Sequence, residues 1–409
     1  MSYEYFDIDN TGSVWSSADL PENLVRTPQH VEAVNEIAKP ILQQSKTAKP
    51  VLIAGDTGVG KTVLIQLISE KLHLARWKVV KVSASDLIAG QRYVGDIENN
   101  VKNVAEYFKD NNESLWVAPA FHEFLFMGSY DAKPSGVLEQ LLPYLEKRNL
   151  HFIAEIDSRY LEKLLQARPK VRDICEIIRI EPSGRDFTHK LAEQWVAQDS
   201  RPALWEKRGK DFIAETYSLA HQYLNHGQNP GMVINLLKAT KQQVNIRDRE
   251  ARITIHTVIE ALSKSTGMPH VILDDRERLD IEVLHAHFSK RVVGQQEAVR
   301  QIVERIAMIK AGLADPSRPA GVFLFVGPTG TGKTEIAKTL ASYLFSSEES
   351  MIRLDMSEFQ TGDSLYRLLG DGREMSDQFA LVNHIRKKPF SVVLLDEFEK
   401  AHRKRTINY

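Results

Sequence analysis

Short apolar runs and amphipathic segments alternate through the first 180 residues of the chain. Four of the runs have the length of buried strands, namely residues 51–54, 79–82, 115–118 and 151–156. The segments between them repeat apolar residues at helical spacing, as Leu64, Ile68 and Leu72 do. Because consecutive parallel strands need a crossover, usually a helix, this alternation predicts a parallel sheet covered by helices.

The pattern changes after residue 182. Residues 183–262 keep helical spacing with few strand signals, which predicts a small helical domain. A second alternating unit follows, with strands expected at 322–326, 351–354 and 391–395. The expected organisation is a flexible lead-in, a first α/β domain, the helical domain, a linker and a second α/β domain, with boundaries at 1–20, 21–182, 183–262, 263–290 and 291–409.

A sequence of the form G-x-x-x-x-G-K-[ST] occurs once in each α/β unit, after an apolar run and before a helical segment. In this context it predicts a phosphate-binding loop, and chance glycine-rich turns are a poor alternative for two such matches. The first loop comprises Gly55, Asp56, Thr57, Gly58, Val59, Gly60, Lys61 and Thr62. The second loop comprises Gly327, Pro328, Thr329, Gly330, Thr331, Gly332, Lys333 and Thr334.

Both loops supply the groups that bind a nucleoside triphosphate. Glycines allow backbone N–H groups to surround the β-phosphate at the N-terminus of a helix. Lys61 or Lys333 adds a positive charge for the β- and γ-phosphates, and the hydroxyl of Thr62 or Thr334 is a ligand for Mg²⁺. The expected fold is therefore α/β, with tandem P-loop nucleoside triphosphatase sheets, and the expected cofactors are ATP and Mg²⁺.

Composition and charge narrow the class of partner and the compartment. Lys and Arg number 53 against 54 Asp and Glu, so the net charge of -1 predicts no nucleic-acid or membrane partner. The single cysteine, Cys175, cannot form an internal disulfide, which is typical of a reducing compartment. With no signal peptide and no apolar run of about 18 residues, the chain is expected to be cytoplasmic.

Asp396 and Glu397 follow the last apolar run of the second unit. In P-loop enzymes an Asp in this position lies near Mg²⁺, and a Glu can polarise the attacking water. Because the pair lies downstream of a P-loop, it predicts a hydrolytic site and not simple strand punctuation. The catalytic residues expected at the second loop are Lys333, Asp396 and Glu397, and Thr334 and Asp396 are expected to bind the metal.

The second unit resembles the Clp family of AAA+ unfoldases, the relatives of ClpA, ClpB and ClpC. The resemblance rests on residues 291–295, 311–319, 327–334, 353–359 and 393–402. In the first unit it is thinner and covers residues 50–62, 87–95 and 180–182. No long heptad segment interrupts the helical region, so ClpA is the closer likeness.

The resemblance implies a hexameric ring, expected to be a homo-hexamer, that hydrolyses ATP and pulls polypeptide through a central pore. A protease partner would also fit this family. Tyr93 matches the aromatic residue of the substrate pore loop, with ordinary packing as the alternative. Val292 and Val293 would line the adenine pocket of the second ring, unless they are edge hydrophobes.

The first unit departs from the family pattern after its strand at 115–118. Ala118 and Pro119 stand where the family has Asp and Glu, and His122 and Glu123 are the nearby alternatives, with surface polarity as their simpler interpretation. Alanine and proline offer neither a metal ligand nor a general base. The first site is therefore expected to bind ATP and to hydrolyse it poorly.

Two further departures support that expectation. Only Arg172 can act as an arginine finger where family members carry a pair. The sensor position reads Glu155-Ile-Asp157 where the family has a Thr.

The second unit also departs from the family pattern. A short polar stretch near residues 371–377 replaces the pore loop, and the segments that follow Asp396-Glu397 in the family are missing before Tyr409. These differences predict a truncated chain with weak ATPase activity.

Two functions from different classes fit these observations. The first is an ATP-hydrolysing Clp-type unfoldase subunit. The second is a non-catalytic, nucleotide-binding assembly or adaptor subunit, which the missing arginine finger of the second unit favours. A P-loop kinase or a helicase fits less well, because neither explains the tandem layout or the Asp-Met-Ser-Glu-Phe stretch at 355–359.

Overall fold

In the computed structural model the chain divides into two units, the first made of Met1–Ala203 with His226–Asn235 and the second of Leu204–Asn225 with Leu236–Tyr409. The structure describes residues 8–45, 48–89, 94–127, 136–206, 209–224, 227–247, 251–313, 318–345, 347–360, 368, 381–388 and 390–401. Each unit is described by itself.

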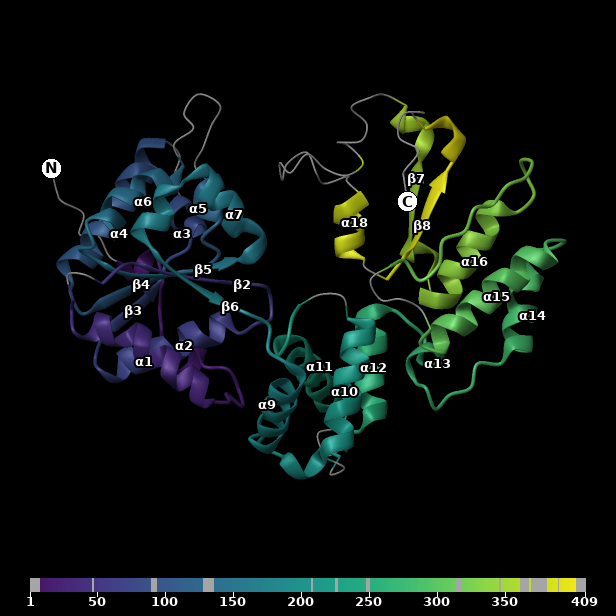
Figure 1. Cartoon of the computed structure of the whole chain (residues 1–409), viewed down its shortest axis with the longest axis horizontal. Helices are drawn as coiled ribbons and strands as arrows, with labels where there is room; N and C mark the ends of the chain where they lie inside the picture. Colours follow the sequence, from purple (N-terminus) through teal and green to yellow (C-terminus); the bar gives the residue numbers. More distant parts are fainter. Residues whose placement is uncertain are drawn as a thin grey trace. The chain divides into compact units, whose positions relative to one another are not determined.

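The first unit is built on a six-stranded sheet with the order β1-β3-β4-β5-β2-β6 (Figure 1). Its strands are β1 (Ser13–Val14), β2 (Val51–Gly55), β3 (Lys78–Lys81), β4 (Ser114–Ala118), β5 (His151–Asp157) and β6 (Glu176–Ile180). All neighbouring pairs are parallel except β1 with β3. The predicted α/β class is confirmed, and the four strands expected in this unit are present.

Helices cover both faces of this sheet because its strands are apolar on both sides. The helices α1 (Pro28–Leu42) and α2 (Lys61–Leu74) pack on one face, with Val51 and Ile53. The other face, which carries Leu52 and Ala54, is covered by α3 (Ala84–Ile88), α4 (Val94–Asp110), α5 (Glu123–Phe126), α6 (Val137–Glu146), α7 (Ser158–Ala167) and α8 (Lys170–Ile174). Cys175 is buried there, and burial raises the pKa of its thiol to about 12.

The described part of the expected lead-in belongs to this first unit. Ile8 is buried in the core on the α4 face, with 2% of its surface exposed. Ser13 and Val14 form β1, which pairs with Lys81 and Val80 at the edge of the sheet. The sequence showed no period here because a two-residue edge strand is too short to produce one.

The region expected to be a small helical domain is mainly helical in its described part, with one isolated β-bridge between Trp205 and Ile253. It contains α9 (Arg185–Ala197), α10 (Gly209–Tyr223), α11 (Gly231–Arg247) and α12 (Ile255–Thr266). The helix α9 lies in the first unit and α10 and α12 in the second, whereas α11 begins in the first unit and continues in the second. The domain boundaries proposed from the sequence therefore stay a prediction. Among the described helices, none has both the length and the apolar character needed to cross a membrane.

The second unit continues with α13 (His270–Leu273), α14 (Ile281–Arg291), α15 (Gln296–Lys310), α16 (Lys333–Phe345) and α18 (Leu381–Lys387). Its strands β7 (Met351–Asp355) and β8 (Val392–Asp396) pair in parallel. They are two of the three strands that were expected in this unit. The helix α16 packs against both strands (Figure 1). The expected linker 263–290 therefore contains helix.

The strand expected at residues 322–326 is wrong for this structure, because the segment has no regular secondary structure. The side chains of Val322, Leu324 and Val326 are 70%, 79% and 86% exposed. In the first unit the corresponding strand, β2, is held between β5 and β6. The described strands of the second unit, β7 and β8, pair with each other, so residues 322–326 have no strand alongside.

Replacement of Leu52 by Ala should destabilise the first unit by about 3 kcal/mol, because Leu52 is fully buried on the central strand β2. The matched control is Leu74→Ala at the end of α2, where the side chain is 79% exposed, with an expected change of less than about 0.5 kcal/mol. Urea unfolding followed by tryptophan fluorescence tests this, since Trp15, Trp77, Trp116 and Trp195 belong to the first unit. Equal destabilisation by the two variants would contradict the buried position of Leu52 and the exposed position of Leu74.

Candidate nucleotide-binding sites

The first loop connects β2 to α2, and its backbone requires glycine at two places. Gly58 and Gly60 have φ values of 95° and 105°, in the left-handed region that costs little for glycine alone. The ammonium of Lys61 donates hydrogen bonds to the carbonyl oxygens of Gly55 and Asp56, both at 2.8 Å. The lysine therefore folds back over the loop, where its charge faces any anion that the loop holds.

The second loop has the same geometry. Gly330 and Gly332, the equivalents of the two glycines above, have φ values of 83° and 89°. The ammonium of Lys333 donates to the carbonyl oxygens of Gly327 and Pro328 at 2.6 and 2.7 Å. Two segments with different neighbours thus adopt one loop conformation, which supports the interpretation of both as phosphate-binding loops.

The turn that leads into α11 and the first residue of that helix hold the first loop in place. The backbone N–H of Gln228 donates to the carbonyl of Thr57 at 2.8 Å, and the N–H of Gly231 donates to the carbonyl of Gly58 at 2.9 Å. A Cβ at Gly231 would lie 2.5 Å from the carbonyl oxygen of Gly58, closer than carbon and oxygen approach. Glycine is therefore needed at Gly58 and at Gly231. The sequence alone did not reveal this contact.

Carboxylates reach the first loop from the neighbouring strand β5. Ile53 pairs with Glu155 across the β2–β5 ladder, and Gly55 pairs with Asp157. Because side chains alternate along a strand, Glu155 lies on the face of Ile153, which is the face that α2 covers. There the hydroxyl of Thr62 donates a hydrogen bond of 3.0 Å to Oε2 of Glu155.

Asp157 accepts its hydrogen bonds from Arg159 and from the hydroxyl of Thr57, and none from Lys61. Burial alone would raise the pKa of Asp157, but hydrogen bonds from the side chain and backbone of Arg159 and from the hydroxyl of Thr57 lower it to about 2. Burial lowers the pKa of Lys61, and the charges of Glu155 and Asp157 oppose that shift. Among the charged groups beside the first loop, Asp157 is therefore paired with Arg159, and the Lys61 ammonium bonds to loop carbonyls.

Strand register shows which residues of the first unit occupy the positions of Asp396 and Glu397. In the second unit the helix-capping residue Asp355 pairs with Asp396 across β7 and β8. In the first unit the helix-capping residue is Ser83, and the β3–β4 register, continued two residues beyond its last pair, places it opposite Pro119. Pro119 is therefore the equivalent of Asp396.

This equivalence corrects the alignment expected from the sequence by one residue. Ala120 becomes the counterpart of Glu397, and both residues have positive φ values, 45° and 52°. Ala118, which the sequence placed in the metal-binding position, lies fully buried in the core on the α4 face. The conclusion that the first unit has no acidic pair here is unchanged, since proline and alanine occupy both positions.

The other candidates of the first unit lie as follows. The ring of His122 stacks on that of Tyr160, with centroids 4.0 Å apart and an interplanar angle of 1°. Glu123 begins the short helix α5, and Arg172 is exposed on α8. Tyr93 lies outside the described residues, as does the stretch near 371–377.

In the second unit, Asp396 and Glu397 lie at the end of β8. Asp396 accepts a hydrogen bond of 2.7 Å from Arg353 on the adjacent strand β7. Glu397 forms an ion pair of 2.7 Å with Lys400. Within the described part of this unit, neither carboxylate has a hydrogen bond to Thr334. The hydrogen bond between Thr62 and Glu155 at the first loop therefore has no counterpart between Thr334 and these two carboxylates.

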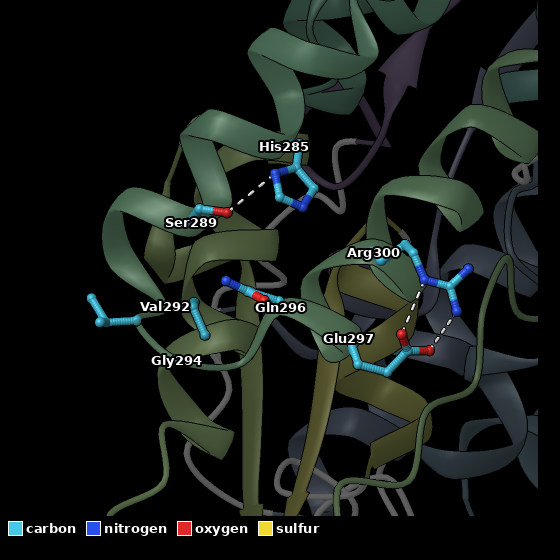
Figure 2. A pocket seen from close by; sticks show the side chains of 8 residues that line it. His285, Ser289, Val292, Gly294, Gln296, Glu297 and Arg300 are labelled. Atoms are coloured by element: carbon cyan, nitrogen blue, oxygen red, sulfur yellow. Dashed lines mark hydrogen bonds and ion pairs between the residues drawn. The ribbon is translucent and has the colours of Figure 1, made fainter.

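A pocket of about 560 Å³ lies beside the turn that joins α14 to α15 (Figure 2). Val292 is buried, and its Cγ1 would lie 4.0 Å from a Cβ placed on Gly332 of the second loop, whereas Val293 is 82% exposed. The pocket is lined by His285, Ser289, Val292, Val293, Gly294, Gln296, Glu297 and Arg300. Both valines line this pocket, and the adenine pocket expected at Val292 and Val293 stays a prediction.

The residues of the first loop fit a nucleotide with its divalent cation. A Cβ on Gly60 would meet no atom within 4 Å, so open space lies next to this glycine. Thr62 and Glu155 bring a hydroxyl and a carboxylate together, and oxygen ligands of this kind suit Mg²⁺. A bound Mg²⁺ would neutralise phosphate charge there.

Two family models match the chain. Residues 51–166 match the ATPase family associated with various cellular activities (AAA), and residues 318–406 match the AAA domain of the Cdc48 subfamily. Each match includes one of the two loops. The second match also includes Asp396 and Glu397.

Similar proteins extend the likeness over most of the chain. An ATP-dependent Clp protease ATP-binding subunit ClpL of Staphylococcus aureus (strain USA300) is 25% identical over 434 residues, covering 90% of this chain and 61% of that protein. The solved S. cerevisiae Hsp104:casein complex has a TM-score of 0.61 at 24% identity and covers 92% of this chain and 66% of that chain. The S. cerevisiae Hsp104-ADP complex gives the same values, and at this identity the likeness shows the fold.

Replacement of Gly231 by Ala should weaken nucleotide binding at the first loop by about tenfold, because relief of the Cβ contact with Gly58 costs roughly 1–3 kcal/mol. Binding of a fluorescent ATP analogue is measured in a Lys333→Ala background, which silences the second loop. The control is Gly184→Ala, where a Cβ meets no atom within 4 Å. Unchanged affinity in Gly231→Ala would show that this contact does not shape the loop.

Proposed function

Because the chain belongs to the Clp-type AAA+ ATPases, we propose that it binds ATP at both loops, hydrolyses it at the second, and uses the energy to remodel or thread polypeptide. The observation that carries this proposal is the duplicated loop, with equivalent left-handed glycines and a lysine bonded to two loop carbonyls. The chain spans 61% of the length of its ClpL relatives, so the activity of a whole protein is part of the proposal.

At the second loop, each side chain has one role in the proposed reaction. Lys333 binds the β- and γ-phosphates, and Thr334 and Asp396 bind Mg²⁺, which neutralises charge on the phosphates when bound. Glu397 orients and polarises the attacking water. Asp396 contacts Arg353 in the structure, so a bound cation would compete with that guanidinium for the carboxylate.

At the first loop, Lys61 and Thr62 support binding, whereas Pro119 and Ala120 cannot polarise water. We infer that this site holds ATP and contributes to assembly. The proposed assembly is a homo-hexamer, with Arg172 as the residue that reaches a neighbouring site. The relatives named as subunits of a Clp protease support a protease partner, and the Hsp104 structure with casein supports a polypeptide substrate.

Glu397→Gln should abolish phosphate release and leave ATP affinity unchanged or tighter, because the substitution removes only the group that polarises water. Steady-state phosphate release and binding of a fluorescent ATP analogue are measured on the same preparations. Glu399→Gln is the matched control, since it removes an exposed carboxylate two residues away. Phosphate release that persists in Glu397→Gln would assign hydrolysis to another residue.

The same experiment separates the two classes of function. A parent chain that binds ATP at both loops and releases no phosphate would favour the nucleotide-binding assembly or adaptor subunit. A parent chain that binds no nucleotide would contradict both.

Tyr93→Ala should weaken binding of fluorescent casein and change the free energy of unfolding by less than about 1 kcal/mol, if Tyr93 contacts polypeptide and not the core. Glycines flank this residue at Gly90 and Gly95, as in exposed loops that bind ligands. Casein binding is measured by fluorescence anisotropy with ATP present. A large loss of stability with unchanged casein binding would assign Tyr93 to packing.

A further inference from the structure

Resting on the proposed ATP-binding function, we propose that Glu155 is the carboxylate that binds the divalent cation of the nucleotide at the first loop. It would take the place of the aspartate that this unit lacks. The sequence presents Glu155 as a departure from a family pattern, but the structure gives its side chain a position and a partner that suit this role.

The position follows from strand pairing. Ala118 on β4 pairs with Ala154 on β5, so the next residues on the two strands, Pro119 and Glu155, lie side by side. Pro119 is the equivalent of Asp396, the acidic residue of the second unit. The carboxylate of Glu155 therefore comes from the strand next to the one that would normally supply it, and from the side nearer to β2.

The partner is the hydroxyl that binds the cation in a P-loop. Thr62 lies in the first turn of α2 and donates a hydrogen bond of 3.0 Å to Oε2 of Glu155. A carboxylate that already contacts this hydroxyl can bind the same cation directly or through a water molecule. At the second loop Asp396 is occupied by Arg353, whereas the described residues give Glu155 no ion pair.

Asp157 does not compete for this role. Its two carboxylate oxygens accept hydrogen bonds from Arg159 and from Thr57, so its charge is already neutralised. Ala120 leaves the water-polarising position without a base. Glu155 would therefore give this site a bound cation without restoring hydrolysis.

The test measures how Mg²⁺ changes the affinity for a fluorescent ATP analogue in a Lys333→Ala background, with Mg²⁺ or with EDTA. Mg²⁺ should tighten binding in the parent, and Glu155→Gln should reduce that enhancement by about tenfold or more. Because Gln keeps the size of Glu and can still bond to Thr62, the fold is expected to persist, and thermal unfolding checks this. The control is Glu176→Gln, because Glu176 begins β6, which is separated from β5 by β2, and lies at the end of the sheet away from the loop.

A second variant tests the position itself. Pro119→Asp combined with Glu155→Gln should recover the Mg²⁺ enhancement, because it places a carboxylate where the second unit has Asp396. Mn²⁺ bound in the presence of the analogue, counted by electron paramagnetic resonance, should fall in Glu155→Gln and return in the double variant.

The outcomes are distinguishable. Nucleotide binding with an equal Mg²⁺ enhancement in parent and Glu155→Gln would overturn the role of Glu155 and leave ATP binding intact. A parent that binds nucleotide with no Mg²⁺ enhancement would overturn it as well. Absence of nucleotide binding in the parent would instead contradict the proposed function of the first loop.

Discussion

The alternation of side chains along the parallel strands beside β2 determines which groups can reach the first loop. On β5, every second side chain, from Phe152 to Ile156, packs in the core on the α4 face. The residues between and after them, Ile153, Glu155 and Asp157, face α2. Because α2 begins at Lys61, the lysine proposed to bind phosphate, only the second set can approach a ligand held there. A shift of one residue in this register would bury both carboxylates and remove them from the site.

The two loops form an internal comparison in which the backbone is kept and the chemistry differs. Ala120 and Glu397 share a left-handed conformation that costs a residue with a Cβ roughly 1 kcal/mol. Since Ala120 has no carboxylate to position, the shape of this turn does not depend on the acidic side chain. The strand that precedes it and the apolar residue that follows, Phe121 or Phe398, are the features common to both copies.

Local sequence was enough to predict the loops and most helices and strands, because glycine spacing and apolar period are local properties. The errors concern pairing between distant segments. Residues 322–326 have the composition of a strand but no neighbouring strand in the described part of their unit. The equivalence of Pro119 with Asp396, and the place of Glu155 beside Thr62, both depend on register that no single segment encodes.

Cys175 makes the chain suitable for labelling at a single introduced cysteine. It is the only cysteine of the chain, it is buried against the first sheet, and its thiol stays protonated at neutral pH. Since the thiolate is the reactive form, maleimide dyes should leave this residue unmodified in the folded protein. One cysteine introduced at an exposed site would then be labelled alone, so fluorophores or spin probes can be attached without first removing the native thiol.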